Sequence, residues 1–505
     1  MHDFHLFRQY EFDLCAKEFV FPCRWARDSS LGFGQPMFVF YGQSPYWLGQ
    51  LFVFSGFQII DSVKITFILS LVLSGLAMYI LASRFWGRLG GLVSALFYIY
   101  APYRAVDVWV RGALPEALAF IFFPLILYFL ETKRYLLLSG SLALLLITHN
   151  LSLYMFLPFL GLWWLLRSRD LKVIHSGLLA LLLSAFYWLP VVVEGSWINL
   201  SSTTQNYYTY AHHFTSLFQL FISRAWGFGG SVWGPNDTMS FSVGHLHWLL
   251  PLLILIIMLL KKTSKKILYL ISYFLFLALF ALFLTHGKSE ILWKIIPGMP
   301  FVQFPWRFLT MAGLFLALAA GTVIHLTKNT LVLSALLITL ILINGQFFRP
   351  DIWRPVTDRQ QFSGALWQEQ ISSAISDYWP ATAGVIPTEV APRLPFTDSG
   401  LGEVTATELD FGTHRRLYNL TVASDYAKVS FPVVHYPGWT ALVDGILHPV
   451  FPSGDLGLLT TRLTTGSHRV ELLFTDTVDR TLGNVISAIT LLGLVSWIVF
   501  KPRHA

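Results

Sequence analysis

The clearest shortage in this 505-residue sequence is charge. Asp, Glu, Lys and Arg together make up only 12% of the residues, whereas soluble domains carry about a quarter. Hydrophobic residues reach 55%, and the mean hydropathy is +0.59. Too few charges remain to cover a water-exposed surface, so this composition excludes a soluble enzyme and a disordered protein. It predicts an integral membrane protein.

Cysteine is also scarce. Cys15 and Cys23 are the only two, which excludes a disulfide-rich scaffold. In an oxidising compartment they would close a short loop, and otherwise they are two packed thiols; the sequence favours neither state. The P-loop, the Gly-rich dinucleotide fingerprint, the paired CxxC motif and the nucleophile elbow are missing as well. Their absence disfavours ATP-driven transport and nicotinamide chemistry.

Long apolar runs occupy most of the chain and predict membrane-spanning α-helices rather than the alternating segments of a β-barrel. We predict about eleven spans, with one more before Met1. The eleven runs cover 64–83, 89–102, 117–130, 135–148, 152–166, 173–193, 246–260, 267–285, 309–324, 331–348 and 482–500. The shorter ones either extend into flanking aromatic sequence or are broken helices buried against neighbours.

Basic residues predict the orientation. Lys and Arg concentrate in the short connections at 84–88, 131–134, 167–172, 261–266, 325–330 and 501–505. The positive-inside rule assigns these connections to the cytoplasm, so the net charge of +7 does not indicate nucleic acid binding. The long loops 1–63, 194–245 and 286–308 then lie outside. Since residues 1–63 need a way across, we expect a preceding helix; the alternative is that this segment crosses unaided.

Acidic residues divide the chain into domains. Residues 349–480 hold 15 of the 28 Asp and Glu and predict an extracytoplasmic domain. Residues 359–376 are expected to be helical, and the β-rich runs between 417 and 474 to form a β-sandwich. Turns are predicted at Asp444-Gly445 and at Thr465-Gly466-Ser467. The transmembrane domain then covers 1–348, and 481–505 forms a final helix with a cytoplasmic tail.

The chain begins with His2-Asp3-Phe4-His5, at the predicted outer face. Asp3 is suited to act as a general base toward an acceptor hydroxyl, with His2 beside it. His2, Asp3 and His5 are alternatively metal ligands, and His5 is the one we assign to a metal site. The non-functional interpretation is a solvated helix start.

A short outer turn carries Asp107, Arg111 and Glu116. The two acids are candidate metal ligands and Arg111 a phosphate ligand; the alternative is internal salt bridging. Arg24 and Arg307, each flanked by aromatic residues, are further candidates for binding phosphate through the guanidinium fork. Arginine beside tryptophan also marks any membrane boundary.

Histidines on the predicted outer side complete the set. His149 ends one apolar run and His245 starts another. The loop 194–245 between them is rich in Trp, Tyr and Gly, which suits stacking on a sugar face or contact with lipid headgroups. Such histidines are more often surface residues than ligands.

The order of several motifs resembles a family of polytopic bacterial membrane proteins labelled 6-pyruvoyl-tetrahydropterin synthase-related. The matching blocks are His2-Asp3-Phe4-His5, Phe21-Pro22-Cys23-Arg24-Trp25, Gly32-Phe33-Gly34-Gln35-Pro36, Phe40-Tyr41, Arg111-Gly112-Ala113-Leu114-Pro115-Glu116, Gln303-Phe304-Pro305-Trp306-Arg307 and Tyr436-Pro437-Gly438-Trp439. No zinc histidines of a soluble pterin synthase can be placed in this sequence. The architecture instead resembles the GT-C glycosyltransferase superfamily.

The GT-C resemblance implies an inverting glycosyl transfer at the outer face of the cell membrane, from a polyprenyl-phosphate sugar. It implies that Asp3 is the base and that Asp107 or Glu116 helps to bind a divalent metal ion. The sequence departs from that pattern, because these loops contain no Asp-Glu or Asp-x-Glu pair. The alternatives are a non-catalytic protein that handles lipid-linked glycans, a membrane scaffold and, less favoured, a secondary transporter.

Overall fold

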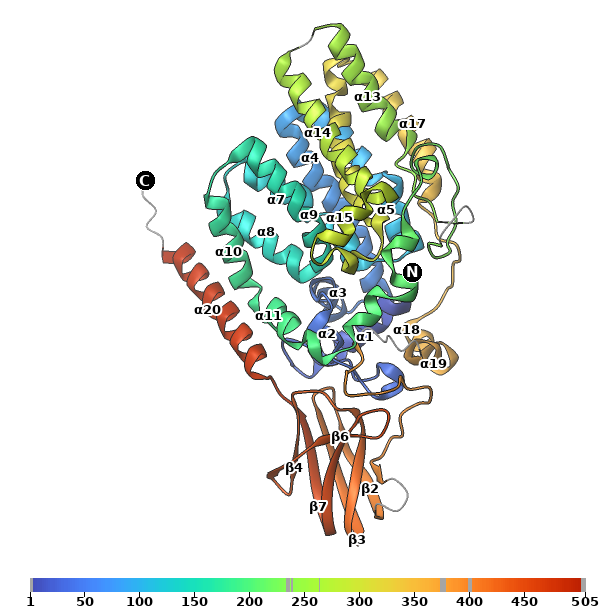
Figure 1. Cartoon of the computed structure of the whole chain (residues 1–505), viewed down its shortest axis with the longest axis vertical. Coiled ribbons are helices and arrows are strands. Elements are labelled where there is room, and N and C mark those ends of the chain that lie inside the picture. Colours follow the sequence, from blue (N-terminus) through green and yellow to red (C-terminus); the bar gives the residue numbers. More distant parts are fainter. Residues whose placement is uncertain are drawn as a thin grey trace. The chain divides into compact units, whose positions relative to one another are not determined.

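The computed structural model describes residues 3–232, 237, 239–262, 264–372, 378–397 and 402–500, with the elements labelled in Figure 1. The chain forms two compact units. The first unit comprises Met1–His5, Lys64–Ala180 and Thr203–Pro355, and the second comprises Leu6–Val63, Leu181–Ser202 and Val356–Ala505. The acidic C-terminal segment therefore shares a unit with two stretches from the N-terminal half, a division that differs from the domain boundaries predicted at 348 and 480.

Helices make up most of the first unit, and the second unit combines helices with a sheet. Those that lie wholly or mostly in the first unit are α4 (Ile59–Ile99), α5 (Pro102–Ala105), α6 (Leu114–Ala119), α7 (Phe122–Glu131), α8 (Tyr135–Thr148), α9 (Asn150–Trp163), α10 (Lys172–Leu183), α12 (Leu217–Phe221), α13 (His245–Leu260), α14 (Lys265–Thr285), α15 (Glu290–Ile295), α16 (Leu309–Ala320) and α17 (Thr330–Asn344). Those of the second unit are α1 (Asp3–Lys17), α2 (Met37–Phe40), α3 (Ser44–Phe54), α11 (Ala185–Glu194), α18 (Asp358–Gln361), α19 (Gly364–Ser372) and α20 (Val478–Phe500).

The prediction of a mostly helical chain with several long apolar helices is confirmed. Within the described residues, seven helical segments are long and apolar enough to span a membrane: Ile59–Ile99, Leu114–Glu131, Asn150–Ser168, Lys265–Thr285, Pro305–His325, Thr330–Phe347 and Val478–Phe500. An eighth span results if α10 and α11, bent by 75° at their junction, cross together.

The number eleven and the orientation stay predictions. The runs 135–148 and 246–260 form α8 and α13, which are shorter than a straight span needs. The runs 64–83 and 89–102 both belong to α4, which Gly87 interrupts with φ 68° and ψ −177°. Glycine tolerates this conformation because it has no Cβ.

At the junction of α10 and α11, backbone groups have no hydrogen-bond partner within their own helices. A residue of α20 provides the partner. The Ser487 hydroxyl accepts a hydrogen bond from the Phe186 N–H (2.9 Å) and donates one to the Leu182 carbonyl (3.2 Å). Gly483, one turn earlier, lets the helices approach, since a Cβ there would lie 2.7 Å from the Ala185 carbonyl oxygen. A broken helix is tolerated in an apolar environment when a neighbour satisfies the freed groups.

One antiparallel sheet forms the C-terminal part of the second unit. Its strands are β1 (Phe396–Thr397), β2 (Val404–Phe411), β3 (Arg415–Val434), β4 (Trp439–Val443), β5 (Ile446–His448), β6 (Phe451–Ser453) and β7 (Leu458–Phe474). The long strands β3 and β7 pair in the centre, β2 flanks β3, and β4 flanks β7 (Figure 1). Alternate residues such as Tyr418 and Leu420 are buried in a core shared with Val470 and Leu472.

The sheet confirms one predicted turn and corrects another. Asp444 and Gly445, both with positive φ, connect β4 to β5 as predicted. The prediction of a turn at Thr465-Gly466-Ser467 is wrong, because these residues continue β7. Gly466 pairs with Val422 at a register irregularity of β3. Glycine in a strand often marks such a bulge. All seven strands are joined in one hydrogen-bonded antiparallel network, and the sandwich-like packing stays a prediction.

The two cysteines form a disulfide, so the alternative of two free thiols is wrong. Cys15 ends the buried part of α1, and Cys23 follows it by eight residues. Both are 1% exposed. The bond closes the loop that connects α1 to the buried Trp25.

We predict that Ser487→Ala lowers the free energy of unfolding in detergent by about 1–2 kcal/mol, because a buried donor and acceptor lose their partner. Thermal unfolding measures the effect. Thr490→Ala is the matched control, since the Thr490 hydroxyl bonds only to the Ile486 carbonyl of its own helix. Equal melting temperatures for the two variants would contradict the role of Ser487.

We also predict that the double variant Cys15→Ser, Cys23→Ser loses about 2–3 kcal/mol of stability, because the unfolded chain regains the entropy of a short loop. The measurement compares oxidised wild type with the double variant in the same detergent. An unchanged unfolding midpoint would show that packing alone holds this segment.

Candidate functional site

A tight turn in the first unit brings Glu116 back beside Arg111. One turn of π-helix, Val106–Val110, follows α5. Gly112 then reverses the chain with φ 56°, and Pro115 starts α6, where it needs no N–H donor. Asp107 and Arg111, four residues apart, share one face of the helical turn.

Arg111 binds both acids of this segment. Its Nη1 donates to Asp107 Oδ1 (2.9 Å), to Glu116 Oε2 (2.7 Å) and to the Tyr103 hydroxyl (3.1 Å). The Tyr103 hydroxyl in turn donates to Glu116 Oε1 (2.8 Å). Both carboxylates are at most 1% exposed. The contacts of this turn agree with the alternative of internal salt bridging.

Arg307 reaches the same carboxylate from a distant part of the chain. It lies in the 3₁₀ turn Pro305–Phe308, and its Nε is 3.8 Å from Glu116 Oε2. Its Nη1 donates to the Val302 carbonyl (2.8 Å) and to Gln303 Oε1 (3.3 Å). We call Tyr103, Asp107, Arg111, Glu116 and Arg307 the Arg111–Arg307 cluster.

The surroundings of this cluster carry more positive than negative charge. Arg104, fully buried, donates to Ser74 Oγ (3.1 Å) and to the carbonyls of Ala117 and Ser70 (3.2 and 3.3 Å). With Arg111 and Arg307 it makes three guanidinium groups, against the two carboxylates of Asp107 and Glu116, and both carboxylates interact electrostatically with each of the three.

The pKa values of the turn residues reflect this environment. Burial, followed by repulsion from Glu116, raises the pKa of Asp107 well above its usual range. Burial alone would lower the pKa of Arg111, but the interactions with Glu116, Tyr103 and Asp107 outweigh the effect of burial and raise this pKa. Arg111 therefore stays charged, and Asp107 is the carboxyl group more easily protonated.

His5 and His149 lie near the cluster. His5 Nε2 accepts a hydrogen bond from the Leu114 N–H (3.2 Å), which holds the start of α1 against the turn between Arg111 and Glu116. His149 Nδ1 is 2.7 Å from Ser152 Oγ. Burial lowers the pKa of His149 to about 4, a shift that Glu116 opposes and Arg307 and Arg111 reinforce, so this imidazole is neutral at pH 7.

The remaining candidates of the first unit are less well connected. Asp3 begins α1, but its side chain and the whole of His2 lie outside the described residues. His245 begins α13 and is half-buried; no hydrogen bond or ion pair in the described part of the chain joins it to the cluster. Its neighbour His247 is the buried one, with Nε2 2.8 Å from the Phe97 carbonyl oxygen.

The predicted metal ligands do not form a ligand set. Among the described residues, no group of three or more His, Cys, Asp or Glu could hold a metal ion. Asp107 and Glu116 face Arg111, and His5 faces a backbone N–H. A guanidinium occupies the position that a cation would need between the two carboxylates.

Aromatic rings connect the cluster to a shallow pocket. Arg111 lies over the Trp306 ring (4.9 Å) and Arg307 over Phe304 (5.1 Å), and these two rings stack 4.8 Å apart. Phe304 contacts His213 (4.7 Å). The pocket beyond is lined by Tyr207, His212, His213, Ser231 and Val232.

Arg24 belongs to a different set of contacts, in the second unit. Its Nη2 donates to Asn484 Oδ1 (3.0 Å), and its Nε is 4.0 Å from Asp476. Burial lowers the pKa of Arg24 to about 10, although Asp476 opposes this. The phosphate-binding role of Arg24 stays a prediction.

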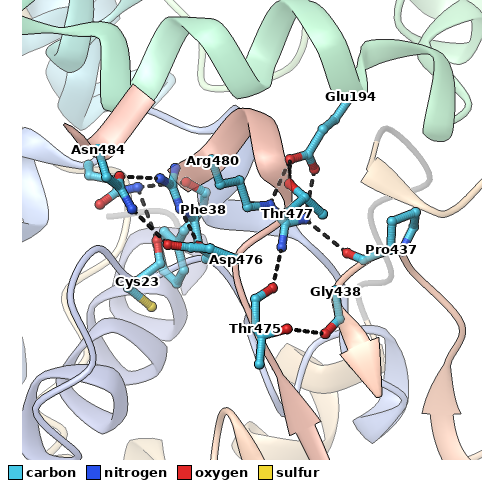
Figure 2. Close-up of polar contacts among 12 residues, drawn as sticks. Cys23, Phe38, Glu194, Pro437, Gly438, Thr475, Asp476, Thr477, Arg480 and Asn484 are labelled. Atoms are coloured by element: carbon cyan, nitrogen blue, oxygen red, sulfur yellow. Dashed lines mark hydrogen bonds and ion pairs between the residues drawn. The ribbon is translucent and has the colours of Figure 1, made fainter. Parts of the chain in front are cut away.

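The same unit contains a fully buried ion pair between Glu194 and Arg480 (Figure 2). Arg480 Nε and Nη2 donate to the two oxygens of Glu194 (2.6 and 2.8 Å), and the Tyr436 hydroxyl donates to the same carboxylate (2.7 Å). Arg480 also donates to the carbonyls of Pro437 and Thr475. These contacts join α11, the sheet and α20.

Sequence reasoning did not assign roles to Tyr103, Arg104, Gln303 or the Glu194–Arg480 pair. Tyr103 and Asp107 stand four residues apart, a spacing that could have indicated a shared helical face. Gln303 and Arg307 show the same spacing. The Glu194–Arg480 pair left no local signal, because its members are 286 residues apart.

We predict that Glu116→Gln lowers the free energy of unfolding by about 3–5 kcal/mol, because buried guanidinium groups lose their counter-charge. The matched control is Glu290→Gln, which removes a carboxylate paired with Lys294 in an exposed i,i+4 pair; exposed pairs contribute little. Chemical denaturation of both variants in detergent tests this. Equal stabilities would contradict the central role of Glu116.

Comparisons with known proteins assign no function to this cluster. No protein-family model, curated protein or solved structure matches the chain. What this site does therefore has to be argued from its own residues, contacts and charges.

Proposed function

We propose that this protein is a membrane-embedded, glycosyltransferase-like protein that transfers a sugar from a polyprenyl-phosphate donor to an acceptor at the outer face of the cell membrane. The observation that carries the proposal is how Arg111 and Arg307 are held. Among the described residues, every hydrogen bond of either guanidinium runs through Nη1. Each side chain is 10–14% exposed, so the Nη2 of each arginine remains for a ligand.

An anion is the ligand that this charge balance favours. Arg111 and Arg307 pair with the two carboxylates, Arg104 adds a third buried guanidinium without an ion pair to either of them, and the pKa of one carboxyl group, Asp107, is raised. Uncompensated charge is costly in a low-dielectric site. A phosphate brings the missing negative charge and matches the planar fork of arginine.

The proposed chemistry is a single displacement. The acceptor oxygen forms a bond to the anomeric carbon while the bond from that carbon to the phosphate oxygen breaks. Asp3 takes the acceptor proton, and Arg111 and Arg307 stabilise the charge that grows on the leaving phosphate. The contact of His5 with Leu114 supports Asp3 as the base, because it brings the start of α1 to the turn that carries Arg111.

No step of the proposal passes through a metal ion. The residues do not fit one, since Arg111 engages the carboxylates of both Asp107 and Glu116. Arginine supplies the positive charge that a divalent ion would otherwise bring to the leaving group.

The outer location is part of the proposal and has two supports. The density of Lys and Arg in the short loops follows the positive-inside rule. The Cys15–Cys23 disulfide suits an oxidising compartment, where such bonds persist.

A second function has a specific observation in its favour. Both described acids of the cluster are paired with Arg111, so neither is free to act as a base. A protein that binds and presents a lipid-linked glycan, without cleaving it, would need the same anion site and no base. The two functions differ in whether Asp3 is essential.

We predict that Asp3→Asn lowers transfer from a polyprenyl-phosphate sugar by a factor of about 10²–10⁴ while donor binding stays near wild type. Arg307→Ala should lower transfer and, unlike Asp3→Asn, also weaken donor binding, because the phosphate loses a charged ligand. Release of polyprenyl phosphate by the purified protein measures transfer. Asp351→Asn, an exposed acid of the first unit, is the control.

Two outcomes would decide against the enzyme. Wild-type protein that binds the donor without releasing polyprenyl phosphate would favour the glycan-handling function. Normal turnover by Asp3→Asn would remove Asp3 as the base and leave the phosphate site standing.

A further inference from the structure

The backbone just before Arg307 adopts a rare conformation. Gln303 has φ 66° and ψ −48°, a combination close to that of a γ-turn with positive φ. The Phe304 N–H donates to the Val302 carbonyl at 2.7 Å, which is the hydrogen bond of such a turn. This turn is strained and rare for a residue with a side chain.

The turn places two oxygen atoms on one nitrogen of Arg307. The Val302 carbonyl and the Gln303 side-chain carbonyl both accept hydrogen bonds from Nη1 of Arg307 (2.8 and 3.3 Å). The Gln303 amide nitrogen donates to the Thr203 carbonyl (2.7 Å). The Gln303 side chain is thus fixed at both ends and links the 203 segment to the guanidinium.

Holding Nη1 in this way fixes the direction of the rest of the guanidinium group. Nε points toward Glu116 Oε2 at 3.8 Å and has no hydrogen-bond partner among the described residues. Phe304 packs on the face of the group at 5.1 Å. A planar group held at one nitrogen and one face keeps its remaining N–H donors in a single orientation.

We infer that Gln303 is a positioning residue for the phosphate-binding edge of Arg307, and that the strained turn at Gln303 serves this purpose. The inference rests on the proposed function for the nature of the ligand. Strained backbone persists where surrounding contacts hold it, and it concentrates at binding sites. Pre-orienting the fork reduces the rotamer freedom that Arg307 would otherwise lose on binding a phosphate.

The test measures binding of farnesyl phosphate, and of uncharged farnesol, to the full-length protein in detergent. We expect Gln303→Ala to weaken farnesyl phosphate binding about tenfold, roughly the effect of losing one oriented charge-assisted contact, with farnesol binding unchanged. Arg307→Ala should weaken it at least as much. Gln346→Ala is the matched control, since among the described residues the Gln346 amide donates to the nearby Ile343 carbonyl alone.

A second measurement separates the effect of the strained backbone at Gln303 from the effect of its side chain. Gln303→Gly also removes the amide, but glycine adopts positive φ without a steric penalty. We expect Gln303→Gly to melt at a higher temperature than Gln303→Ala. Both variants should bind farnesyl phosphate more weakly than wild type. The opposite order of melting temperatures would overturn the claim that the turn is strained.

The remaining outcomes are distinguishable. Equal loss of farnesyl phosphate and farnesol binding in Gln303→Ala would mean a general structural effect and would overturn the inference. Normal phosphate binding in Gln303→Ala, with loss in Arg307→Ala, would overturn it and leave the proposed function intact. Wild-type protein that does not prefer farnesyl phosphate over farnesol would overturn the phosphate site and the inference together.

Discussion

The arrangement of the first unit around its candidate site depends on one buried carboxylate, that of Glu116. It accepts hydrogen bonds from Arg111 and Tyr103 within its own turn, and it lies 3.8 Å from Arg307, which comes from a distant segment. A charge at this depth is tolerated only when it is paired and hydrogen-bonded. Glu116 therefore connects segments that apolar packing alone would not hold in register.

The second unit contains a comparable group that differs in one decisive respect. Glu194 also pairs with an arginine and accepts from a tyrosine hydroxyl, but Arg480 uses Nε and both terminal nitrogens for protein partners. Arg480 is saturated and fully buried, as expected of a structural link. Arg111 and Arg307 use one terminal nitrogen each and reach the surface, so they retain donors for a ligand.

Much of the fold could be predicted from residue patterns. The apolar runs assigned to spans are mostly helical, because an apolar environment requires a segment to satisfy its own backbone groups, although those at 89–102, 117–130 and 173–193 are interrupted. The Asp444-Gly445 turn followed from local chemistry. The turn assigned to Gly466 did not form, because the central pairing of two long strands outweighed the local preference of one glycine. Local signals could not reveal that pairing. They also could not reveal that Ser487 provides hydrogen-bond partners for the backbone groups at the junction between α10 and α11.

The sequence by itself determined the membrane class, the helical segments and a short list of charged residues, because composition and periodicity depend on neighbours along the chain. It left open whether Asp107 and Glu116 face a metal or an arginine. Only the tertiary structure decided that, through the Gly112 turn that brings Glu116 to Arg111 and the strained turn at Gln303 that orients Arg307. Long-range electrostatic pairing depends on where distant segments meet, and no local pattern records it.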